Sequence, residues 1–280
     1  MNKVLQTRSR SRSAARLNVA IVGASGGIGR EIAETYRGEN AALYLSANRG
    51  FESLRNFTTD PDFPSANLFQ ADLSQTNAGD KLADEILARI SQNDNNGSDP
   101  PRLDALVVAV GIDLMTKESK ALEFNARLER AWKIDVAATI ALTRALGQAM
   151  ANRRDAELDE AYAPSLVLFG CNGVGRAQEN ETAQIYSTCK GAVVAFAKSF
   201  AQELDGKARI NTVSPGWIRT AWGAQASATA TERAQRESLE KRWGTAKEVA
   251  KVVRFLLAED ASYVNGQDVQ VDGGYSYRRK

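Results

Sequence analysis

Short apolar runs alternate with longer amphipathic runs along most of the chain, and this alternation predicts strands followed by helices. The apolar runs that we expect to be strands occupy residues 18–24, 42–49, 66–74, 103–112, 164–170, 208–216 and 267–274. Apolar residues recur at helical spacing in residues 27–40, 79–91, 126–150, 186–204 and 244–261. The run at 103–112 is apolar over almost its whole length, which is typical of a strand with both faces covered.

Regular alternation of strands and helices predicts right-handed crossovers and a parallel sheet with helices on both faces. The fold class expected is therefore α/β, a doubly wound parallel sheet. We find no internal repeat and no linker, so residues 17–280 are expected to form a single domain. Such sheets bind ligands outside the carboxyl ends of their strands.

The stretch "VGASGGIGR" joins the first predicted strand to the first predicted helix. Gly23 permits a tight turn, Gly27 lets the backbone approach a pyrophosphate, and Gly29 lets helix and strand pack closely. The phosphate charge would meet the exposed N–H groups at the start of the helix. A glycine-rich turn alone is weak evidence, but its place between a strand and a helix predicts a dinucleotide site.

Several further motifs follow in a fixed order: "QADLS" after the third strand, "YSTCK", "SPGWIRT", "RWGTAKEVA" and "VDGG". Together with the glycine loop they resemble the short-chain dehydrogenase/reductase family, and its β-ketoacyl-carrier-protein reductases in particular. The resemblance runs from Asn18 to Gly274 and implies a Rossmann fold. Val22 stands where the family usually has Thr, and Ala246 where it has Pro.

Tyr186 and Lys190 lie four residues apart in a predicted helix, so their side chains share one face. A free tyrosine has a pKa of ~10, and we expect the neighbouring ammonium to lower the pKa of Tyr186. In the family, such a pair moves a proton to or from a carbonyl oxygen while nicotinamide moves a hydride. The resemblance thus implies that Tyr186 is the acid or base and that Lys190 holds the nicotinamide ribose. An isolated pair at this spacing would instead be typical of a helix surface.

Two catalytic helpers of the family are replaced here. The family ends its fifth strand with a serine that polarises the carbonyl, whereas this strand ends "LFGCNGVG". Gapless alignment places Asn172 in that position with Cys171 beside it, although the spacing to Tyr186 is one residue longer than in the family. The family's asparagine on the central helix aligns with Asp135. An amide donates hydrogen bonds but an ionised carboxylate does not, so Asp135 could pair with Lys190 and weaken its pull on Tyr186.

The second strand ends without the acidic residue that would hold the ribose 2′-hydroxyl of NAD. Arg49, helped by Ser25, is placed to meet a 2′-phosphate, which favours NADP(H) over NAD(H); an exposed Arg49 without a ligand is the alternative. The resemblance implies that Asp72 meets the adenine amino group and that Ile218 (backbone) and Thr220 meet the nicotinamide carboxamide. The other implied cofactor contacts are Gly23, Gly27, Ile28, Gly29, Leu73, Ala109, Gly111, Lys190, Pro215 and Gly216.

These replacements leave two functions open. In one, the protein is an NADP(H)-dependent oxidoreductase acting on a carbonyl or secondary alcohol, with Asn172 and Asp135 as altered helpers. In the other, it binds the dinucleotide with weak or no catalysis, as a sensor or a subunit partner. Retention of both Tyr186 and Lys190 favours the first.

Composition narrows the remaining classes. The 280 residues are 43% hydrophobic, include no His and only two Cys, and show no apolar run long enough to cross a membrane. We therefore expect no metal site, no disulfide and a reducing, cytoplasmic location. Residues 1–16 form a basic arm that we expect to be disordered. The rest of the chain is mildly acidic, which argues against a nucleic-acid partner.

Residues 217–244 follow the sixth strand, where the family selects its substrate, and Trp217 and Trp222 could wall a pocket or only anchor packing. The resemblance implies a small-molecule carbonyl or alcohol as substrate and a homodimer or homotetramer as the assembly. Apolar faces at 137–150 and 191–201 suit such pairing, and equally suit packing on the sheet.

Overall fold

A computed structural model describes residues 16–93, 101–154, 163–174, 180–220 and 226–275. Its centre is a seven-stranded sheet in the order β3-β2-β1-β4-β5-β6-β9, with every neighbouring pair parallel. The strands are β1 (Leu17–Val22), β2 (Ala41–Ala47), β3 (Ser65–Gln70), β4 (Ala105–Val108), β5 (Ser165–Phe169), β6 (Arg209–Pro215) and β9 (Asp268–Val271). The prediction of a doubly wound parallel sheet is confirmed, and the predicted basic arm lies almost wholly outside the described residues.

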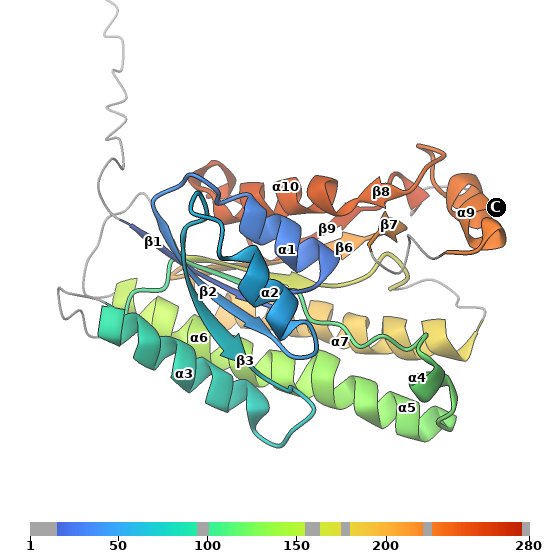
Figure 1. The fold of residues 1–280 in the computed structure, drawn as a ribbon, viewed down its shortest axis with the longest axis horizontal. Coiled ribbons are helices and arrows are strands. Elements are labelled where there is room, and N and C mark those ends of the chain that lie inside the picture. The colour runs from blue at the N-terminus through green and yellow to red at the C-terminus, as the bar shows by residue number, and fades with distance from the viewer. Residues whose placement is uncertain (1–15, 94–100, 155–162, 175–179, 221–225, 276–280) are drawn as a thin grey trace, which may run out of the picture.

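Helices cover both faces of this sheet (Figure 1). On one face lie α1 (Gly27–Glu34) and α10 (Ala246–Leu257), and on the other lie α3 (Ala78–Asn93), α6 (Thr139–Arg154) and α7 (Glu181–Glu203). Successive residues of a strand point to opposite faces. In β1, Ala20 and Val22 accordingly join one core, and Val19 and Ile21 join the other. Two buried cores explain why the strands are apolar at almost every position.

The order of the strands reverses between β1 and β4, which places the ends of these two strands side by side. The Ala109 N–H, just after β4, donates to the carbonyl of Val22 at 2.8 Å. In open α/β sheets the crevice at this reversal is where ligands bind. The fold therefore brings the turn after β1 and the residues after β4 to one place.

Several elements were not apparent from the pattern. Two short helices, α2 (Phe51–Phe57) and α4 (Lys117–Lys120), follow β2 and β4, and α9 (Ala228–Glu237) lies near a separate pair of short strands, β7 (Ile218–Arg219) and β8 (Gly244–Thr245). A single turn, η2 (Glu259–Ala261), follows α10. In Figure 1, α4, β7, β8 and α9 all lie towards the right, beyond one end of the sheet.

The predicted helix at 126–150 is not uniform. It consists of α5 (Phe124–Ala131), a π-helical segment η1 (Trp132–Ala138) and α6. Such wider turns within a helix are frequent at functional sites. The helix predicted to begin at Tyr186 begins earlier, at Glu181, because the Asn180 side chain caps it by accepting from the Ala183 N–H at 3.0 Å.

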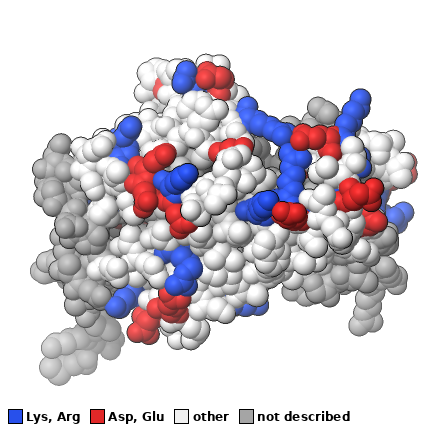
Figure 2. Space-filling view, turned by 90° about the horizontal axis from the view of Figure 1, so that it is seen from below, with Lys and Arg blue, Asp and Glu red and all other residues white. Residues whose placement is uncertain are grey.

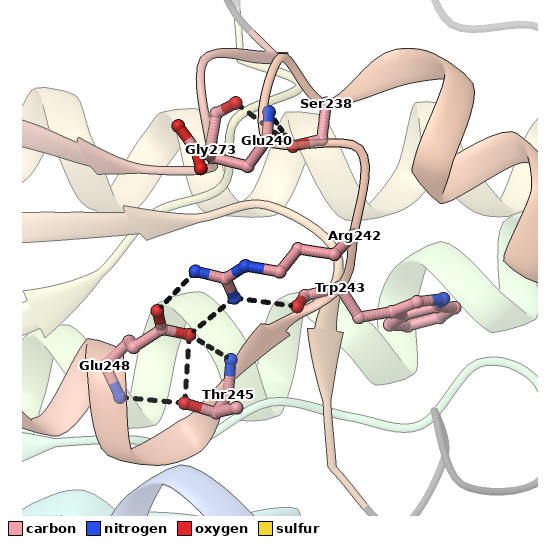
Figure 3. Close-up of polar contacts among 7 residues, drawn as sticks. All are labelled: Ser238, Glu240, Arg242, Trp243, Thr245, Glu248 and Gly273. Atoms are coloured by element: carbon pink, nitrogen blue, oxygen red, sulfur yellow. Dashed lines mark hydrogen bonds and ion pairs between the residues drawn. The ribbon is translucent and has the colours of Figure 1, made fainter.

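Both ends of α10 are fixed by charged side chains. At its start, Thr245 and Glu248 form a reciprocal capping box, and Arg242 binds both carboxylate oxygens of Glu248 at 2.7 and 3.0 Å (Figure 3). The Arg242 guanidinium is the largest cause that lowers the pKa of the Glu248 carboxyl to about 2. At its end, the buried Arg209 donates to the carbonyl of Leu256 in the last turn of the helix and to that of Ala258, which follows the helix.

Acidic and basic side chains are intermixed on the described part of the face shown in Figure 2, with uncharged surface between them. No single-sign patch of the kind that nucleic acids need covers the described part of this face. Among the helices that the structure describes, none is both long and apolar enough to cross a membrane.

Candidate functional site

The turn between β1 and α1 has no room for side chains at two of its glycines. Gly23 has a φ of 86°, and a Cβ there would lie 2.6 Å from the carbonyl oxygen of Ala109. A Cβ at Gly29 would collide with the carbonyl oxygen of Gly23. The turn therefore packs directly on β4 and on its own helix, as the sequence predicted.

The start of α1 is open to an anionic ligand. Gly26 caps the helix without any side-chain hydrogen bond, and the first turn carries no acidic residue. The N–H groups at Gly27, Ile28 and Gly29 therefore lie at the positive end of an uncapped helix. A Cβ at Gly27 would lie 3.2 Å from the Thr220 side chain, so Thr220 closes over the turn from the other side. This geometry fits a pyrophosphate group.

The ends of β2 and β3 supply the other predicted contacts. A Cβ at Gly50 would lie 2.6 Å from the Ser25 Cβ, so Ser25 of the glycine turn lies against the residue that follows Arg49. After β3, Asp72 accepts hydrogen bonds from the N–H and hydroxyl of Ser74 at 3.0 and 2.7 Å, which hold the pKa of its carboxyl below the usual value. Leu73 beside it is buried.

Arg49 has a neighbour that sequence reasoning missed. Its guanidinium lies 3.5 Å from the carboxylate of Glu118 on α4, and both side chains are exposed. Glu118 is also held by Arg130 of α5 at 3.0 Å. No local signal in the sequence marks this contact, because it depends on how the segment after β4 returns across the sheet edge.

Tyr186 and Lys190 share one face of α7, as their spacing predicted. The Lys190 ammonium lies 5.6 Å from the centre of the Tyr186 ring and donates to the carbonyl oxygen of Val110 at 2.8 Å. A Cβ at Gly111 would lie only 3.7 Å from that ammonium. Lys190 is buried whereas Tyr186 is 36% exposed, so the phenol is the accessible member of the pair.

Asp135 lies on η1 and reaches the same ammonium. One of its oxygens accepts from the Ile112 N–H at 2.8 Å, and the other lies 3.6 Å from the Lys190 Nζ. The side chains of Asp135 and Lys190 are 0% and 3% exposed, so this ion pair is enclosed by protein. That second oxygen has no hydrogen-bond partner among the described residues.

Burial and the attraction between opposite charges shift the pKa values of Asp135 and Lys190 in opposite directions. Withdrawal from water raises the pKa of Asp135, and Lys190 offsets only part of this change. Burial alone would lower the pKa of Lys190, but Asp135 and Tyr186 together raise it. The pKa of Tyr186 is raised by loss of water, against the pull of Lys190 and with the help of Asp135. Lys190 therefore favours the phenolate as expected, but loss of water and Asp135 outweigh it, so the pKa of Tyr186 lies above its ordinary value.

Two residues that follow β5, Cys171 and Asn172, lie where the alignment places the family's serine. Cys171 is buried, and burial raises the pKa of its thiol. Asn172 is half-buried, and its backbone N–H donates to the Pro215 carbonyl at the end of β6 at 3.4 Å. Its amide has no hydrogen bond to any other described residue, which leaves it available to a ligand.

The segment after β6 holds the remaining predicted contacts. A Cβ at Gly216 would lie 2.7 Å from the Asp272 Cα, and the Thr220 N–H donates to the Ile218 carbonyl at 2.9 Å. Trp217 packs edge-on against Trp243 with ring centres 5.4 Å apart, and its indole N–H donates to Glu237 at 3.0 Å. These contacts make Trp217 a packing anchor, and Trp222 lies outside the described residues.

One surface hollow lies between β3 and α3. A second lies around Ser238, Arg242 and Gly273 and is also lined by Ile218. Neither is lined by Tyr186 or Lys190. The predicted site is instead the open edge of the sheet. There the structure brings together the glycine turn, the ends of β4 and β5, Thr220, and the Tyr186–Lys190 pair.

The sequence is similar to known reductases and oxidoreductases. The family described as enoyl-(acyl carrier protein) reductase matches residues 23–276. An uncharacterized oxidoreductase, YmfI of Bacillus subtilis, is 30% identical over 262 residues, covering 91% of this chain and 97% of the relative. The 3-oxoacyl-(acyl-carrier-protein) reductase FabG of Thermotoga maritima is 38% identical over 90 residues, covering 32% of this chain and 37% of the relative.

Solved structures agree at the level of the fold. A short-chain dehydrogenase/reductase from Brucella melitensis has a TM-score of 0.74 at 27% identity, and the match covers 94% of this chain and 97% of that one. The angucycline C-6 ketoreductase LanV, solved with bound NADP, has a TM-score of 0.78 at 20% identity, and the match covers 94% and 96% of the two chains.

Proposed function

Because the chain belongs to the short-chain dehydrogenase/reductase family, whose members are oxidoreductases, we propose that it is an NADP(H)-dependent carbonyl reductase or alcohol dehydrogenase. The substrate would be a small molecule with a ketone or secondary alcohol. Two similar proteins support these choices: FabG, a 3-oxoacyl-(acyl-carrier-protein) reductase, supports a carbonyl substrate, and LanV, solved with bound NADP, supports the cofactor.

The chain's own residues would hold the cofactor along the carboxyl edge of the sheet. The uncapped start of α1, from Gly27 to Gly29, would bind the pyrophosphate. Arg49 and Ser25 would bind the 2′-phosphate, because the two lie on adjacent segments. The other proposed contacts are Gly23, Ile28, Asp72, Leu73, Ala109, Gly111, Lys190, Pro215, Gly216, Ile218 and Thr220. When bound, the nicotinamide would supply or accept a hydride at the substrate carbon.

The proton would be moved by Tyr186. Its phenol oxygen gives a proton to the carbonyl oxygen in reduction and takes one from the hydroxyl in oxidation. Lys190 lies beneath the phenol, is held by the Val110 carbonyl, and would bind the nicotinamide ribose. The free amide of Asn172 would donate a hydrogen bond to the substrate oxygen. Asp135 touches no substrate and acts through Lys190.

One observation carries this proposal. The accessible phenol and the buried ammonium lie on one helix face, and the ammonium is bonded to the strand end that also contacts the glycine turn. A surface Tyr–Lys pair would not have its lysine enclosed. We expect NADPH to bind with micromolar affinity in a fluorescence titration, and a panel of ketones and 3-oxoacyl thioesters to give NADPH oxidation. Tight binding without turnover of any carbonyl would favour a sensor or subunit partner instead.

Replacing Arg49 with alanine is expected to weaken NADPH binding about tenfold or more, because a hydrogen-bonded charge on the 2′-phosphate is lost. NADH lacks that phosphate, so its affinity should stay within about twofold. Arg55→Ala is the matched control, because Arg55 lies nearby on α2 and pairs with Glu52. Equal losses for NADPH and NADH would contradict the role of Arg49.

Glu118 should compete with the 2′-phosphate for Arg49, since the two anions approach one guanidinium. Glu118→Gln is therefore expected to tighten NADPH binding about two- to fivefold, the modest size typical of an exposed ion pair. The gain should shrink as salt is added, because salt screens exposed charges. An unchanged NADPH affinity at low salt would show that breaking the Arg49–Glu118 ion pair costs no measurable binding free energy.

A further inference from the structure

The buried ion pair between Asp135 and Lys190 changes the charge that Tyr186 meets. An ammonium alone favours the phenolate of a neighbouring tyrosine. Here the carboxylate that faces this ammonium at 3.6 Å is enclosed just as completely. Low local dielectric makes both charges act strongly at short range. At the phenol, the pull of Lys190 is therefore partly offset by Asp135.

We propose that Asp135 is a positioning residue that opposes the pull of Lys190 on Tyr186, favours the protonated phenol over the phenolate, and thereby suits Tyr186 to give a proton to a carbonyl oxygen in reduction. This inference rests on the proposed function and names its direction. It concerns only residues of this chain, and Asp135 itself contacts neither substrate nor cofactor.

The reduction balances as follows. The carbonyl carbon would receive a hydride, which is two electrons and a proton, from the bound nicotinamide. The Tyr186 hydroxyl supplies a second proton to the carbonyl oxygen, so a ketone becomes a secondary alcohol. The phenolate left on Tyr186 then regains a proton from solvent. Oxidation needs the opposite starting state, a phenolate, and Asp135 disfavours that state.

Three described groups act electrostatically on the phenol, each from a different element. Lys190 on α7 favours the phenolate, whereas Asp135 on η1 and the thiol of Cys171 after β5 oppose it. Burial raises the pKa of the Cys171 thiol, so this group is neutral at pH 7 and adds little charge. Loss of water also raises the pKa of the phenol itself. The balance between Lys190 and Asp135 is therefore what a single substitution can change.

A merely structural role for Asp135 would be to hold the Ile112 N–H and the wider turn of η1. Asp135→Asn separates the two roles. The asparagine carbonyl still accepts from that N–H, whereas the negative charge beside Lys190 is gone. If the asparagine variant folds poorly, Asp135→Ser removes the same charge and keeps a hydroxyl oxygen near the N–H.

The first readout is the ionisation of Tyr186 in the protein without nucleotide. It is measured by the ultraviolet absorbance of the phenolate during a pH titration. The chain has seven tyrosines, so the Tyr186 signal is taken as the difference from the same protein with Tyr186→Phe. We expect the phenolate to form at lower pH in Asp135→Asn than in the parent protein. The matched control is Asp104→Asn, which removes a buried, ion-paired carboxylate just before β4, at the opposite end of that strand from the Val110 carbonyl that holds Lys190, and should leave the Tyr186 titration unchanged.

The second readout is the pH dependence of kcat/KM for alcohol oxidation, which needs the phenolate. We expect its rise with pH to occur at lower pH in Asp135→Asn than in the parent protein, in step with the absorbance titration. An identical Tyr186 titration in the parent and in folded Asp135→Asn or Asp135→Ser would overturn the inference. If no carbonyl is turned over, the proposed function fails while the absorbance titration still decides whether Asp135 controls the phenol.

Discussion

Tyr186→Phe is expected to lower kcat for carbonyl reduction by about a thousandfold or more and to leave NADPH affinity within about twofold. The substitution removes only the phenol oxygen, and a positioned proton donor contributes typically ~10²–10⁴-fold to such a step. The chain contains no histidine, and no other described acid near Lys190 can replace the phenol: Asp135 is buried in its ion pair, and burial raises the pKa of the Cys171 thiol. Single-turnover NADPH oxidation and a fluorescence titration measure the two quantities.

The control for this substitution is Tyr263→Phe. Tyr263 is fully exposed and lies beyond η2, so losing its hydroxyl should change neither turnover nor binding. Turnover of Tyr186→Phe at the parent rate would refute the role of the phenol as the proton donor. A parallel loss of NADPH binding would show that Tyr186 shapes the cofactor site instead.

Gly23→Ala is expected to have the second largest effect, because two independent obstacles coincide at one residue. The φ of 86° disfavours any L side chain by about 1–2 kcal/mol. The new Cβ would also lie 2.6 Å from the Ala109 carbonyl oxygen, so β4 and the turn must move apart. We expect the free energy of unfolding to fall by about 3 kcal/mol or more and NADPH binding to be lost at micromolar protein concentrations.

Gly38→Ala is the matched control, since Gly38 has a φ of 73° but no atom within 4 Å of an added Cβ. It carries the same backbone strain without the collision, so it should cost about 1–2 kcal/mol and leave NADPH binding intact. Urea unfolding and fluorescence titration measure both variants. Equal stability of the two variants, with NADPH binding retained in both, would mean that the contact between the turn and Ala109 relaxes freely.

The sheet could be predicted from the sequence because its strands are buried on both faces. Residues 103–112 are apolar at nearly every position, and helices separate the strands along the chain, which leaves few arrangements other than a doubly wound parallel sheet. The glycine turn was predictable for a similar reason. Its spacing follows from contacts that admit no side chain, such as that of Gly29 with Gly23.

The wider turn at η1 could not be predicted, since apolar residues continue at helical spacing through 126–150 and one extra residue in a turn barely disturbs that period. The ionisation of Tyr186 could be predicted only in part, for a related reason. Helical spacing placed Lys190 beside the phenol, but the outcome depends on burial and on Asp135 from another helix. Burial is a property of the folded molecule and leaves no local pattern in the chain.

The hydrogen bonds of Arg209 at the end of α10 affect how the protein unfolds locally. Its guanidinium bonds the carbonyls of Leu256 and Ala258 at the helix end and that of Val264 on the way to β9, while its own backbone begins β6. Arg209 therefore links the end of α10, the connection to β9 and the start of β6. If one of these segments unfolded locally, the buried Arg209 charge would lose hydrogen-bond partners. We therefore expect the three segments to unfold together rather than one at a time.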